Sequence, residues 1–99
     1  MENLGERNVL RIPLAGLQFA PDIRQRITQE EAAFRQHCRR LYRGYEPALI
    51  AALLTQLRWA LQHPAYNFQG LLNGVKTSNE DILFYFAFLI PILEQTAAA

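Results

Sequence analysis

The sequence contains one cysteine and one lysine, and its charges almost cancel. A single cysteine, Cys38, cannot form a disulfide within the chain, so nothing points to an oxidising compartment. Ten basic residues oppose nine acidic residues, which gives a net charge of +1. Such a balance provides no global field that would attract nucleic acid or anionic lipid.

Long apolar runs and targeting signals are also missing. The longest apolar run, 82–93, is interrupted by Pro91 and is much shorter than the roughly 20 residues that a membrane span needs. The first residues carry Glu2 and no basic cluster, and no apolar run with a cleavage site follows, so we expect no signal peptide. We therefore expect a cytoplasmic protein that does not bind a membrane.

No stretch has the spacing of a catalytic, nucleotide-binding or metal-binding motif. His37, Cys38 and His63 are the only soft candidate ligands, whereas zinc sites usually have four ligands, or three and a water. Adjacent helical side chains also point about 100° apart, which separates His37 from Cys38. We therefore expect no enzyme activity, cofactor or metal, and we interpret Cys38 as a core residue.

Apolar residues are abundant for so short a chain. They make up 51% of the 99 residues, although a small domain buries a smaller fraction of its surface than a large one. The excess must be exposed or covered by a partner. The chain is therefore interpreted as one domain that associates with itself or with another protein.

The domain is expected to have an N-terminal arm over 1–26 and a helical part over 27–99. The arm is predicted to be irregular or partly extended, because apolar residues alternate around Pro13 and a proline within a strand lies at its edge. Leu14, Leu17 and Phe19 are expected to pack onto the domain's own core or onto another subunit.

The first helix is predicted to begin at Thr28 and to end at Gly44. Thr28 is followed three residues later by Glu31, which is the capping-box pattern. The apolar stripe of this helix is predicted to consist of Phe34, Cys38, Leu41 and Tyr45.

The second helix is predicted to begin at Pro47, because proline is favoured at the first helical position, and to end near His63. Its short link to the first helix predicts an antiparallel helical hairpin. A short helix near 68–72 is expected in the connection that follows.

A third helix is predicted after Ser78, which can cap it, although the side chains of 82–90 also fit a buried strand. This segment is apolar all round, and a hairpin would cover only part of it. The predicted fold is therefore an all-α small helical bundle that forms a homodimer. The predicted self-association surface comprises Phe84, Tyr85, Phe88 and Leu89.

Arginine is concentrated near the end of the first helix. The candidate partner-binding residues are Arg35, Arg39, Arg40, Arg43 and Trp59. Guanidinium groups bind carboxylates and phosphates in a bidentate manner, and a tryptophan is a good interface anchor. The alternative to partner binding is that these arginines form a solvated helix end, with Arg35 paired to Glu31.

These patterns favour a non-enzymatic protein-interaction module, such as an adaptor, assembly factor or regulator, that acts as a homodimer and binds another protein. The alternative is a small nucleic-acid-binding protein of replication or transcription that uses the arginine cluster. Nucleic-acid binding would weaken steeply as salt is raised.

One local pattern resembles a segment near the C-terminus of some plasmid and phage replication initiators. The residues that carry it are Trp59, Pro64, Asn67, 70–72, Val75 and Lys76. In that family the next segment is typically polar, whereas here the apolar run 82–90 follows. No family is assigned from this pattern.

Overall fold

The computed structural model describes residues 7–20 and 22–98, and all the regular elements in these ranges are helical. This confirms the all-α fold class and excludes a strand over 82–90. The elements are α2 (Arg11–Leu17), α3 (Ile23–Gln29), α4 (Glu31–Arg43), α5 (Pro47–Gln62), the 3₁₀ turn η1 (Phe68–Leu71) and α6 (Asn79–Ala98).

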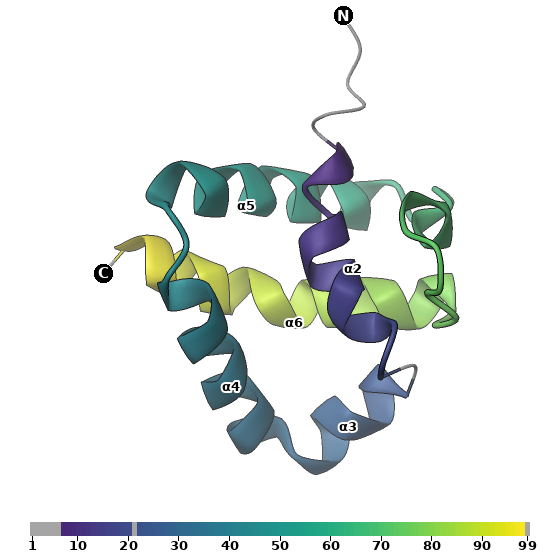
Figure 1. The fold of residues 1–99 in the computed structure, drawn as a ribbon, viewed down its shortest axis with the longest axis horizontal. Helices are drawn as coiled ribbons and strands as arrows, with labels where there is room; N and C mark the ends of the chain where they lie inside the picture. Colours follow the sequence, from purple (N-terminus) through teal and green to yellow (C-terminus); the bar gives the residue numbers. More distant parts are fainter. Residues whose placement is uncertain (1–6, 21, 99) are drawn as a thin grey trace, which may run out of the picture.

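The apolar helix α6 is the central element of the fold. Figure 1 shows α5 running alongside it on one side, while α3 and α4 lie on the other side. The α6 residues that are buried are Ile82, Tyr85, Phe86, Leu89, Ile92 and Leu93. By length and composition α6 could also cross a membrane, but here its apolar side chains form the core of the domain.

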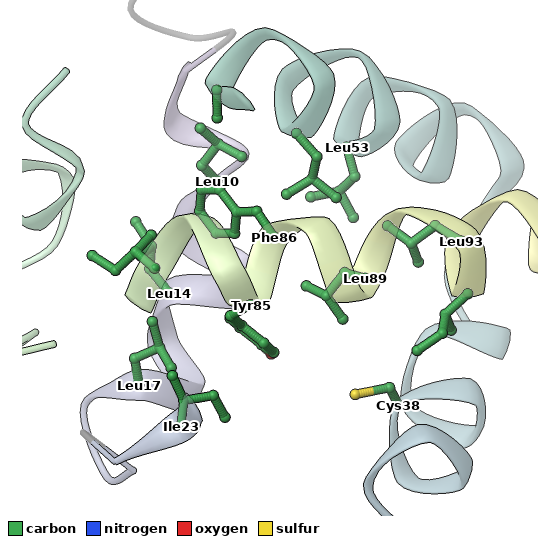
Figure 2. Packing of buried hydrophobic residues seen from close by; sticks show 14 of the residues in the cluster. Leu10, Leu14, Leu17, Ile23, Cys38, Leu53, Tyr85, Phe86, Leu89 and Leu93 are labelled. Atoms are coloured by element: carbon green, nitrogen blue, oxygen red, sulfur yellow. The ribbon is translucent and has the colours of Figure 1, made fainter. Parts of the chain in front are cut away.

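The N-terminal segment is helical and belongs to the core, so the prediction of an irregular or extended arm is wrong for most of 7–26. Residues 1–6 lie outside the described residues. Leu10, Leu14 and Leu17 recur at helical spacing and are fully buried beside Phe86 and Tyr85 (Figure 2). Pro13 lies in the first turn of α2, where a backbone N–H has no helical partner to lose.

The helix predicted to begin at Thr28 is divided into two. Thr28 lies in the last turn of α3, and its hydroxyl donates to the Arg24 carbonyl at 2.8 Å instead of capping the next helix. The backbone bends at Glu30, where φ is −130°, and α4 begins at Glu31. A hydroxyl can bond to the preceding turn as readily as to the following one, and here the preceding turn is favoured.

The predicted hairpin of α4 and α5 is also not formed. Both helices pack on α6, and α4 contacts α3, so α6 occupies the position expected for a direct α4–α5 contact (Figure 1). The buried face of α4 carries Cys38 and Tyr42, whereas Leu41 is 47% exposed. An all-round apolar helix requires neighbours on several sides, and this need outweighs the preference of a short link for a hairpin.

The other helix starts agree with the sequence. Pro47 is at the start of α5, and the amide of Asp81 donates to the Ser78 hydroxyl at 3.2 Å at the start of α6. The short helix expected near 68–72 is η1. Local signals thus located these boundaries, because caps and N-terminal prolines act within a single helical turn.

Candidate functional site

The arginines predicted to form one cluster have different environments in the structure. Arg35 forms an ion pair with Glu31 at 2.5 Å, and its guanidinium carbon lies 4.9 Å from the centre of the Phe88 ring. Arg39 and Arg43 instead line a surface cleft, while Arg40 is exposed. The structure therefore separates a pair of arginines that face a concave surface from one that stabilises the fold.

This arginine cleft lies where the C-terminal ends of α4 and α6 approach the N-terminal end of α5. Its volume is about 550 Å³, within the range of sites that enclose a small molecule or a few side chains. The residues that line it are Arg39, Arg43, Tyr45, Pro47, Ile50, Gln95, Thr96 and Ala97. Three elements contribute, so the cleft depends on the tertiary fold.

The charge of the cleft is uncompensated within the described part of the chain. Arg39 donates to the side-chain oxygen of Gln95 at 3.0 Å, and neither Arg39 nor Arg43 has a carboxylate within ion-pair distance there. Its lining includes two guanidinium groups and no acidic side chain. By contrast, Arg58 is neutralised by Glu94 at 2.6 Å.

The remaining polar groups of the cleft add hydrogen-bonding capacity beside an apolar floor. Gln95 uses its oxygen to accept from Arg39, which leaves its amide hydrogens available. The Thr96 hydroxyl donates to the Ile92 carbonyl at 3.0 Å and retains its lone pairs. Pro47 and part of the Tyr45 ring supply apolar surface, whereas Ile50 is fully buried behind the lining. The cleft can thus receive an anionic group together with a neighbouring apolar one.

Trp59 does not join the arginines on one surface. Its ring stacks on His63 at 4.1 Å and contacts Tyr66 edge-on at 5.2 Å, while the Arg7 guanidinium lies 3.6 Å from its centre. It lies twelve residues along α5 from Pro47, which corresponds to about 18 Å of helix. Trp59 therefore packs against the connection that follows α5, and the structure does not bring it together with the arginines.

The residues predicted for self-association are mostly occupied within the chain. Tyr85 and Leu89 are buried in the core, so they cannot form an exposed dimer surface in this fold. Phe84 and Phe88 are partly buried, and the guanidinium groups of Arg24 and Arg35 cover their rings. Leu10, Leu14 and Leu17 of the N-terminal segment belong to the same core as α6. Part of the apolar surface of α6 that a second subunit was expected to cover is therefore covered within the chain.

The ionisable groups in the core remain neutral. Burial raises the pKa of the Cys38 thiol from its ordinary 9.0 to about 11, and the nearby Arg35 charge opposes this rise only in part. Burial likewise raises the pKa values of Tyr42 and Tyr85. Within the described residues, no group of three or more His, Cys, Asp or Glu side chains could hold a metal ion.

Sequence reasoning missed the two α6 residues of the cleft. Gln95 and Thr96 lie 56 and 57 positions after Arg39 and carry no motif, so only the packing of α6 against α4 brings them to the arginines. The helical spacing of Arg39 and Arg43 was the one local signal. Comparisons with protein-family models, with curated proteins and with solved structures find no match to this chain.

Proposed function

We propose that the chain is a non-enzymatic protein-interaction module whose arginine cleft binds an acidic segment of another protein. The observation that carries this proposal is the pair Arg39 and Arg43, which lines a cleft of about 550 Å³ without a neutralising carboxylate among its lining residues. Two guanidinium groups that face a cavity favour an anionic occupant, and they bind planar carboxylates through paired hydrogen bonds.

The apolar floor narrows the class of partner. Pro47 and the half-buried Tyr45 lie beside the arginines, so the fitting occupant carries an apolar side chain next to an acidic one. Such a peptide would bury apolar area in the cleft while its carboxylate remains at the rim, which is the usual arrangement of an interface. An adaptor, assembly factor or regulator in the cytoplasm is the matching role, and both role and compartment are part of the proposal.

The first test measures the affinity of the intact protein for a labelled peptide of alternating Glu and Leu, with a Gln/Leu peptide for comparison. Fluorescence anisotropy should show binding of the acidic peptide only. Arg39→Glu should weaken binding about tenfold or more, because it replaces an attractive charge by a repulsive one. Backbone NMR signals of Gln95 and Thr96 should shift when the peptide is added.

The matched control is Arg11→Glu, which makes the same change in net charge on the exposed surface of α2. It should leave peptide affinity within about twofold, since surface charges act weakly at a distance in salt. Equal losses in the two variants would exclude the cleft. Failure of the acidic peptide to bind, or binding only of mixed-sequence DNA or RNA with a steep salt dependence, would overturn the proposal.

A further inference from the structure

Phe19 is the most exposed large apolar residue described in the chain. Its side chain is 87% exposed, in the turn between α2 and α3, whereas Leu17 and Ala20 on either side of it are buried. A phenylalanine so exposed forgoes the transfer free energy that burial of an aromatic side chain provides. Its position at a turn makes it a projecting apolar knob.

An apolar hollow lies directly beside this knob. It has a volume of about 130 Å³, too small for a typical small-molecule site but suited to one side chain. The residues that line it are Gly16, Leu17, Ala20, Ile23, Arg26, Phe34, His37, Cys38, Leu41 and Tyr85. Leu17, two residues before Phe19, and Ala20, the next residue after it, both line the hollow, and Leu41 on α4 is half-exposed there.

We propose that Phe19 of one copy of the chain inserts into this hollow of a second copy, and the reverse, in a symmetric homodimer. A two-fold axis requires the same patch on both partners to be complementary to itself. A knob next to a hollow on one surface meets that requirement, because one rotation places each knob opposite the partner's hollow. The proposal is independent of the arginine cleft.

Charge supports a second copy as the occupant. Arg26 lines the hollow, and Asp22 follows the Phe19 knob three residues later. Asp22 directly precedes α3 and Arg26 lies four residues later within it, yet they form no ion pair with each other. In the proposed dimer, Arg26 at the partner's hollow provides the opposite charge for the exposed Asp22, and the two-fold axis repeats this pair.

The interface is small, since each hollow takes a single ring. Interfaces at or below about 1,200 Å² belong to weak or transient complexes. We therefore expect a dissociation constant in the micromolar range, and a dimer that forms as the protein is concentrated. The self-association surface then comprises Phe19, Leu41 and the hollow rather than Phe84, Tyr85, Phe88 and Leu89.

The test is the molar mass of the full chain by light scattering, from about 10 µM to about 1 mM. The mass should rise from 11.4 kDa toward twice that value. Phe19→Ser should weaken the dimer about thirtyfold, as loss of a central aromatic anchor does. Leu61→Ser, the matched control, removes an apolar side chain that is 39% exposed on α5 and should leave the mass unchanged.

A mixing experiment tests the reciprocal geometry. Leu41→Glu places a charge at the hollow and should also give a monomer. A mixture of Phe19→Ser with Leu41→Glu retains one intact knob facing one intact hollow, so partial dimerisation should return. A wild-type protein that stays at 11.4 kDa at the highest concentration, or a dimer unaffected by Phe19→Ser, would overturn the proposal.

Discussion

At the scale of single residues, Cys38 shows how burial fixes chemical behaviour. The residue is 1% exposed between α4 and the core, and its raised pKa keeps the thiol protonated near neutral pH. Since the thiolate is the reactive form, the side chain acts as a small apolar group. The same burial makes deprotonation of Tyr42 and Tyr85 unfavourable in the folded state.

We expect the free energy of unfolding to fall as pH rises above about 9. A group whose pKa is raised in the folded state binds its proton more tightly there, so its contribution is complete below the unfolded value and is lost as pH rises through the folded value. For Cys38 that window runs from 9.0 to about 11, and the tyrosines extend it upward. Urea titrations at several pH values measure this change.

Cys38→Ala is the control for this pH effect. It should move the onset of the decline toward the tyrosine range, because the lowest of the three titrations has been removed. A free energy of unfolding that is constant or rises between pH 9 and 11 would contradict the assignment of these groups to the core.

At the scale of elements, α6 is helical throughout although Pro91 lies inside it. Pro91 is exposed, so it adds no core packing, and it cannot donate the backbone hydrogen bond of a helix interior. The helix persists because Leu89, Ile92 and Leu93 on either side are fully buried. Tertiary packing therefore overrides a local preference.

Pro91→Ala should raise the free energy of unfolding by about 2 kcal/mol. Alanine is favoured over proline in a helix interior by about 3 kcal/mol, and the greater freedom of the unfolded chain offsets about 1 kcal/mol of this. Thermal unfolding followed by circular dichroism measures the gain. Pro64→Ala, outside the helices, is the comparison and should not stabilise the fold; a destabilised Pro91→Ala would show that proline is required there.

The elements also show which parts of the fold were predictable. Pro47 and Ser78 act within one turn, and both marked real helix starts. Pro13 and Thr28 carried ambiguous signals, because a proline fits a first helical turn as well as an edge strand, and a threonine can bond to either flanking turn. The position of α6 between α4 and α5 depends on packing contacts of many residues, so no local sequence pattern could predict it.

At the scale of the whole molecule, the candidate site was only partly predictable for the same reason. The α4 sequence supplied Arg39 and Arg43, but it could not show that Trp59 lies apart from them, because only the fold places residues that are distant in sequence. In the structure, α4 contributes Arg43 to the cleft and Leu41 to the hollow. A dimer through the hollows would carry two clefts, which favours partners with repeated acidic segments.

The domain should unfold as a single unit, since its core joins the first and last described helices. Leu14→Ala should cost about 2–5 kcal/mol, the range for fully buried leucines. Circular dichroism and Trp59 fluorescence should show the same shifted urea midpoint, although Trp59 is on α5. Leu61→Ala is the partly exposed control and should cost much less; separate transitions for the two probes would refute a single unit.

The central position of α6 also has a consequence for how the chain is made. The ribosome synthesises α2, α3, α4 and α5 before it reaches α6, the helix that α3, α4 and α5 pack against. Leu14 and Leu89 belong to the same core, and at about 5–20 residues per second Leu89 is added on the order of ten seconds after Leu14. During that interval the nascent chain presents uncovered leucine stripes, and it should depend on chaperones that shield apolar segments until the core helix emerges.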